Sequence, residues 1–172
     1  MIVLVTGMMR TGTSLVAKQL HLMGVPMGTT MRFPQAKANG QDDWEDIEFT
    51  DMMLNRLMGI DDSDREDFGL RVKQYELSRD GVPVWGVKSP FALPYVTALR
   101  EAFEDVVKVV MTTRDIEQVY RSLDQQQLGL REIQYQLHSF IDKVSPDLVI
   151  DIEESWHSPS TVEQKLQELI WA

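Results

Sequence analysis

The chain has 172 residues, a formal net charge of −10 at pH 7 and no cysteine. Hydrophobic residues make up 43% of it, and no apolar run approaches the length of a membrane-spanning helix, so we expect one folded domain over residues 1–172 and no membrane association. The acidic excess argues against nucleic acid and anionic membranes as partners, and the lack of cysteine excludes disulfides, thiol catalysis and cysteine-held metals.

Short apolar runs and helical periodicities alternate along the chain. The first run, Met1–Thr6, is rich in β-branched residues and predicts a buried parallel strand. Further strands are predicted at Val82–Val87, Val106–Thr112 and Leu148–Ile152. Helices are predicted at Ser14–Met23, Asp42–Met58 (capped by Asp42 or Asp43), Asp61–Ser78, Ala92–Phe103, Ile116–Leu123, Leu130–Val144 and Ser160–Trp171. This alternation is typical of an α/β domain with a parallel sheet.

The segment Gly7–Ser14 (GMMRTGTS) joins the first strand to the first helix and has the spacing of a phosphate loop, G-x4-G-x-[ST]. Its glycines let successive N–H groups converge on an anion, and the helix N-terminus adds positive charge. Thr13 stands where nucleoside triphosphatases carry the lysine that neutralises the β and γ phosphates. The sequence therefore predicts a phosphate or sulfonate site built from Arg10, Thr11, Gly12, Thr13 and Ser14.

This loop, within Thr6–Met23, resembles the 5′-phosphosulfate loop of sulfotransferases that use 3′-phosphoadenosine-5′-phosphosulfate (PAPS). It is most similar to the bacterial and Golgi-type branches, which have arginine at the position of Arg10. A second segment, Val109–Leu123, resembles the family's 3′-phosphate element, an arginine after a strand and a serine eight residues later. The resemblance implies that Arg114 and Ser122 bind the 3′-phosphate, and an arginine fork suits such a group.

Two further segments resemble the same family. Asn39–Asn55 contains Trp44-Glu45-Asp46 and is similar to a bacterial Gly-Tyr-[Phe/Trp]-Glu-Asp segment, and Trp85–Phe91 (WGVKSPF) resembles a Lys-[Ser/Thr/Asp]-Pro element. The resemblance implies that Glu45 is the base that takes the acceptor's proton. It also implies that Lys88 and Arg10 stabilise the sulfonate oxygens during transfer.

The resemblance implies a P-loop-type three-layer fold, with helices on both faces of a mostly parallel sheet of about four to five strands. We expect Met1–Thr6 in the centre, flanked by Val106–Thr112 and Leu148–Ile152, with Val82–Val87 further out. The chain departs from the cytosolic branch at Leu15, where that branch has an aromatic residue that stacks on adenine. Another residue must therefore cover the adenine.

The function that this resemblance implies is transfer of a sulfuryl group from PAPS to a hydroxyl or amine of a small-molecule or carbohydrate acceptor. The expected reaction is an in-line displacement with a glutamate base and without a metal, and its nucleotide product is 3′-phosphoadenosine 5′-phosphate (PAP). Two alternatives stay open, a P-loop nucleotide or nucleoside kinase and a non-catalytic nucleotide-binding protein of the same fold. We expect a cytoplasmic location, because the sequence shows no basic segment followed by the apolar stretch of a secretory signal.

Three of these charged residues also have interpretations that need no ligand. Arg114 would form a surface ion pair with Asp115 or Glu117. Glu45 would be one of several carboxylates at an acidic helix start. Lys88 would be a solvated lysine before a turn proline.

Overall fold

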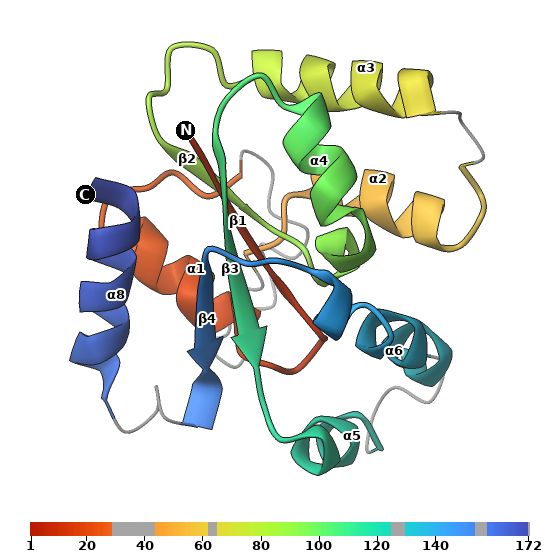
Figure 1. The fold of residues 1–172 in the computed structure, drawn as a ribbon, viewed down its shortest axis with the longest axis vertical. Coiled ribbons are helices and arrows are strands. Elements are labelled where there is room, and N and C mark those ends of the chain that lie inside the picture. Colours follow the sequence, from red (N-terminus) through yellow and green to blue (C-terminus); the bar gives the residue numbers. More distant parts are fainter. Residues whose placement is uncertain (29–43, 62–64, 125–129, 154–157, 172) are drawn as a thin grey trace.

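A computed structural model describes residues 1–28, 44–61, 65–124, 130–153 and 158–171. Within these residues four strands form one parallel sheet in the order β2-β1-β3-β4 (Figure 1). The strands are β1 (Ile2–Gly7), β2 (Trp85–Lys88), β3 (Val107–Thr113) and β4 (Leu148–Asp151). The predicted α/β class with a parallel sheet is confirmed.

The order of the strands differs from the expected one. Strand β1 is internal as expected, but its neighbours are β2 and β3, and β4 pairs with β3 at the far edge. The prediction that Leu148–Ile152 flanks the first strand and that Val82–Val87 lies further out was therefore wrong. All four residues of β2 are buried. Its outer edge is covered by the segment around Met27, which forms a parallel bridge to Gly86.

The helices cover both faces of the sheet (Figure 1). On one face lie α1 (Thr13–Leu22) and α8 (Pro159–Trp171). On the other lie α2 (Ile47–Leu57), α3 (Arg65–Leu77), α4 (Val96–Ala102) and α6 (Arg131–His138). The remaining elements are α5 (Ile116–Asp124), which follows β3, and the 3-10 helices η2 (Pro90–Tyr95) and η4 (Ile141–Lys143). No helix among the described residues is long and apolar enough to cross a bilayer.

Predicted and observed helix bounds differ, most clearly for three helices. The helix expected from Asp42 begins at Ile47, where the Asp46 carboxylate caps it by accepting from the Phe49 N–H at 3.2 Å; Asp42 and Asp43 themselves lie outside the described residues. The helix expected over Ala92–Phe103 is split into η2 and α4, because Pro94 cannot donate a backbone hydrogen bond. The helix expected over Leu130–Val144 is likewise divided into α6 and η4.

The continuous apolar character of β1 reflects burial on both of its faces. Ile2 and Leu4 belong to the core shared with α2, α3, α4 and α6, whereas Val3 and Val5 belong to the core shared with α1 and α8. All four side chains are fully buried. Burying each one contributes about 1.5–3 kcal/mol, so the loop that follows β1 starts from a strand anchored in both cores.

The end of β1 requires a glycine. Gly7 has a φ of 146°, and a Cβ at this position would lie 2.6 Å from the Thr112 carbonyl oxygen on β3. We expect Gly7→Ala to lower the free energy of unfolding by about 3–4 kcal/mol, because backbone atoms cannot move aside easily. Gly59→Ala is the matched control, since Gly59 also has positive φ (66°) but no atom within 4 Å of its Cβ position. It should cost about 1–2 kcal/mol in denaturant unfolding, and equal losses would contradict the steric argument.

Candidate phosphate-loop site

The loop between β1 and α1 is held from inside the protein. Arg10 adopts a left-handed φ of 68°, and Gly12 caps α1 with a φ of 88°. The Thr11 hydroxyl is buried, donates to the Met8 carbonyl at 2.6 Å and shares a hydrogen bond of 2.7 Å with the Thr112 hydroxyl. The Thr11 side chain therefore holds the loop onto β3. The place of Thr11 in the predicted anion site stays a prediction.

A buried glutamine on α6 clamps the same loop. Gln134 is fully buried, and its amide oxygen accepts from the Met9 N–H at 3.3 Å while its amide nitrogen donates to the Met9 carbonyl at 2.9 Å. The Gln134 amide thus satisfies both the backbone N–H and the backbone carbonyl of Met9. The N–H groups that can converge on an anion therefore begin at Arg10, immediately after the clamped residue. Sequence reasoning missed Gln134, because nothing in its local pattern marks a contact with a loop so far away in the sequence.

The structure brings Lys88, Glu45 and Ser14 together beside the loop. The Lys88 ammonium donates to Glu45 Oε1 at 2.8 Å and to the Ser14 hydroxyl at 3.1 Å. Lys88 is 2% exposed and Glu45 is 8% exposed. The interpretation of Lys88 as a solvated lysine was therefore wrong. A buried ammonium needs a partner of opposite charge, and the carboxylate of Glu45 supplies it.

Strand order explains how Lys88 reaches the loop. Val5 on β1 is in register with Lys88 at the end of β2, so both strands end at the same edge of the sheet. The Thr6 hydroxyl donates to the Ser89 carbonyl at 3.0 Å and fixes the turn that follows Lys88. Had another strand separated β2 from β1, as expected from the sequence, Lys88 would not lie beside Ser14.

A second buried ion pair supports the backbone next to Glu45. Arg79 donates to Asp46 Oδ2 at 3.0 Å and to the Tyr75 hydroxyl at 2.9 Å, and both Arg79 and Asp46 are buried. Burial raises the pKa of Tyr75 far above its usual value, with the Asp46 carboxylate adding to the rise, so this phenol stays protonated. Because Asp46 also caps α2, this cluster fixes the direction in which the chain passes through Glu45.

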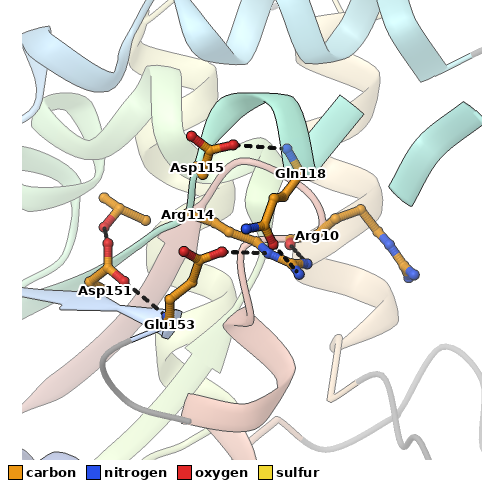
Figure 2. A network of polar contacts seen from close by, with 7 residues as sticks. Arg10, Arg114, Asp115, Gln118, Asp151 and Glu153 are labelled. Carbon is orange, nitrogen blue, oxygen red and sulfur yellow. Dashed lines mark hydrogen bonds and ion pairs between the residues drawn. The ribbon is translucent and has the colours of Figure 1, made fainter. Parts of the chain in front are cut away.

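Arg10, Ser122 and Arg114 meet on the other side of the loop. Arg10 Nε donates to the Ser122 hydroxyl at 2.8 Å, and Arg114 donates to the Arg10 carbonyl at 3.4 Å. Arg114 also donates to Gln118 at 3.0 Å and lies 3.8 Å from a carboxylate oxygen of Glu153 (Figure 2).

The ion pair of Arg114 is not the one that the sequence suggested. Asp115 instead accepts from the Gln118 N–H at 3.1 Å, at the start of α5, and Glu117 pairs with Arg121. The interpretation of Arg114 as the partner of Asp115 or Glu117 was therefore wrong. The side chains assigned to the 3′-phosphate are adjacent to the loop, although their role stays a prediction.

Comparison with family models and with curated proteins finds no match to this sequence. The fold is similar to that of a sugar kinase from Janibacter sp. HTCC2649, with a TM-score of 0.58 and 15% identity over 98% of this chain and 93% of that one. It is also similar to a sulfotransferase from Mycobacterium avium (TM-score 0.59, 14% identity, 98% of this chain) and a shikimate kinase from Bacteroides thetaiotaomicron (TM-score 0.57, 15% identity, 99% of this chain).

The chain spans 63% of the length of that sulfotransferase and 98% of the length of that shikimate kinase. At these identities the likeness shows the fold alone. The fold is the P-loop α/β fold that kinases and sulfotransferases share.

Removing the Gln134 side chain should lower the free energy of unfolding and should also weaken the binding of an anion to the folded protein. Gln134→Met keeps the volume but removes the hydrogen-bond partner of the partly buried Met9 N–H and carbonyl, which costs up to about 3 kcal/mol per group. We expect a matching loss in the free energy of unfolding and, in addition, a clear loss of pyrophosphate affinity measured by calorimetry at a temperature where the variant is folded. Leu137→Ala on the same helix is the control, because Leu137 is equally buried but its apolar side chain makes no hydrogen bond to the loop. Equal pyrophosphate affinity in the two variants would contradict a positioning role for Gln134.

Proposed function

We propose that the protein transfers a sulfuryl group from PAPS to a hydroxyl or amine acceptor. The observation that supports this most is the Lys88 ammonium 3.1 Å from the Ser14 hydroxyl. Ser14 occupies the loop position whose hydroxyl binds the nucleotide-bound Mg²⁺ in P-loop enzymes that use triphosphates. A fixed ammonium at this position would repel Mg²⁺, whereas it would attract the sulfonate group of PAPS.

Each side chain beside the loop has a role in this proposal. The acceptor oxygen or nitrogen forms a bond to sulfur while the bond from sulfur to the 5′-phosphate oxygen breaks, and PAP leaves with the electron pair of that bond. Glu45 takes the proton of the acceptor. Lys88 and Arg10 stabilise the charge on the sulfonate oxygens, and the N–H groups of the loop stabilise the departing phosphate. Because Lys88 already holds Glu45 at 2.8 Å, the base and the cation are oriented before substrates bind.

The proposed 3′-phosphate subsite is formed by Arg114 and Ser122. Arg114 Nε is buried and has no hydrogen-bond partner among the described residues. A buried N–H group without a partner is costly, and a phosphate oxygen would satisfy it. Ser122 lies next to Arg10. One phosphate on Arg114 and a second anionic group at the loop would thus match a nucleotide that carries charge at both ends of its ribose.

A P-loop kinase is the second candidate. The observation in its favour is length, because the chain spans 93% of the sugar kinase and 98% of the shikimate kinase but 63% of the sulfotransferase. In a kinase, Lys88 would replace the loop lysine that is absent at Thr13. A non-catalytic nucleotide-binding protein of the same fold would show binding without turnover.

Ligand-induced thermal stabilisation separates these proposals. We expect PAP to raise the melting temperature, because a ligand at 100 times its Kd adds about 2.7 kcal/mol to the free energy of unfolding. ATP with Mg²⁺ at the same concentration should raise it less, since Lys88 opposes the metal ion. Differential scanning fluorimetry with PAP, ATP with Mg²⁺, and Mg²⁺ alone makes the measurement. A larger shift with ATP and Mg²⁺ than with PAP would overturn the sulfotransferase proposal in favour of the kinase.

Replacing the proposed base should abolish transfer without weakening nucleotide binding. Glu45→Gln keeps an oxygen acceptor for Lys88 but cannot take a proton, so we expect turnover of PAPS to fall by about 10²–10⁴-fold. PAP affinity should change little, because Glu45 faces the acceptor. Glu48→Gln is the matched control, since Glu48 is an exposed carboxylate in the first turn of α2, the helix that follows Glu45. PAPS turnover with a pooled set of hydroxyl compounds provides the assay, and unchanged turnover in Glu45→Gln would exclude Glu45 as the base.

A further inference from the structure

The guanidinium of Arg114 is surrounded by oxygen atoms from three parts of the chain. Its terminal nitrogens donate to the Gln118 amide oxygen and to the Arg10 carbonyl, and Glu153 Oε1 lies 3.8 Å from its Nε (Figure 2). The distance to Glu153 is too long for a hydrogen bond but well within ion-pair range. The Arg114 Nε–H therefore lies near the negative charge of Glu153 but makes no hydrogen bond within the part of the chain that the structure describes. An anion that reached hydrogen-bonding distance of this N–H would displace the Glu153 carboxylate.

Glu153 is held in place by the end of β4. Its backbone N–H donates to Asp151 Oδ1 at 2.9 Å, so the last residue of β4 fixes the turn that carries Glu153 toward Arg114. The Glu153 side chain is 43% exposed and the Arg114 side chain 31% exposed. The carboxylate can therefore move into solvent when another group takes its place, at a modest free-energy cost.

The charges around Arg114 and Glu153 affect how well this part of the protein distinguishes a phosphate from a hydroxyl. Arg10 and Arg114 bring two positive charges to this side of the loop, and Asp115, Asp151 and Glu153 bring three negative ones (Figure 2). A phosphate that approaches Arg114 must displace the Glu153 carboxylate or share the guanidinium with it. A ribose hydroxyl meets no such competition, because it can donate a hydrogen bond to the same carboxylate.

We propose that Glu153 is a specificity-determining residue that sets how strongly the protein distinguishes a nucleotide with a 3′-phosphate from one with a 3′-hydroxyl. This inference rests on the proposed binding of PAP at the loop. Glu153 competes with the 3′-phosphate for Arg114 and so lowers the affinity for PAP, while it leaves the affinity for adenosine 5′-phosphate (AMP) nearly unchanged. A weaker hold on the 3′-phosphate also favours release of PAP after transfer.

Isothermal titration calorimetry with PAP and AMP tests the proposal on the wild-type protein and on Glu153→Gln. Glu153→Gln should tighten PAP binding on the order of two- to fivefold, the range expected for a partly exposed ion pair, and should leave AMP binding unchanged. Glu117→Gln is the matched control, because it removes the same charge from an exposed residue that pairs with Arg121 and not with Arg114. It should alter PAP affinity less than Glu153→Gln does.

The Arg114→Ala background identifies the group through which Glu153 acts. In that background Glu153→Gln should no longer tighten PAP binding. The inference is overturned if Glu153→Gln does not tighten PAP binding, if it tightens AMP equally, or if its effect persists without Arg114. Equal PAP affinity in wild type, Glu153→Gln and Glu117→Gln would overturn the inference alone and leave the proposed function standing. Failure of every variant to bind PAP would overturn both.

Discussion

The buried ammonium of Lys88 is the constraint on which the site depends. An amine this deeply buried is tolerated only with a charged partner and further hydrogen-bond acceptors, and Glu45 and Ser14 meet that need. The hydrogen bonds of the Lys88 ammonium to Glu45 and Ser14 therefore hold together the end of β2, the segment before α2 and the start of α1. Helix α2 is further fixed by the buried pair of Asp46 and Arg79. The position of the catalytic candidates thus follows from the cost of burying one charge.

The phosphate loop depends on contacts that lie behind it. Thr11 bonds to β3 through Thr112, and Gln134 satisfies both polar groups of Met9. These bonds leave the left-handed Arg10 little freedom and set where the anion-binding N–H groups begin. The loop is therefore preorganised by buried hydrogen bonds from β3 and α6, and little ordering is left for a ligand to impose.

Cations gather around this loop in a chain whose formal net charge is −10. Arg10, Lys88 and Arg114 all lie beside it, and each is balanced differently. Lys88 is neutralised by a buried carboxylate and Arg114 by a partly exposed one, whereas Arg10 bonds to the neutral hydroxyl of Ser122. An incoming anion therefore meets little net attraction from the protein as a whole. Its recognition depends on the geometry of these three side chains, which suits selectivity among small anionic ligands.

The sequence by itself determined the features that are local in the chain. The apolar run of β1, the glycines of the loop and the periodicity of α1 specify strand, loop and helix through contacts between near neighbours, and the α/β class follows from their alternation. The family resemblance also pointed to Glu45 and Lys88, without showing that they touch. The loop spacing placed Thr11 in the predicted anion site but did not show that its hydroxyl bonds to Thr112, because that partner on β3 is distant in sequence.

Only the tertiary structure decided which strand lies beside β1. Apolar patterns record how deeply a strand is buried but not which strand it pairs with, so β2 and β4 were assigned to each other's places. That choice put Lys88 next to Ser14. It is also the tertiary structure that placed Gln134 against Met9 and Glu153 against Arg114. Such contacts depend on how the helices and strands pack in three dimensions, and no local pattern of residue types encodes them.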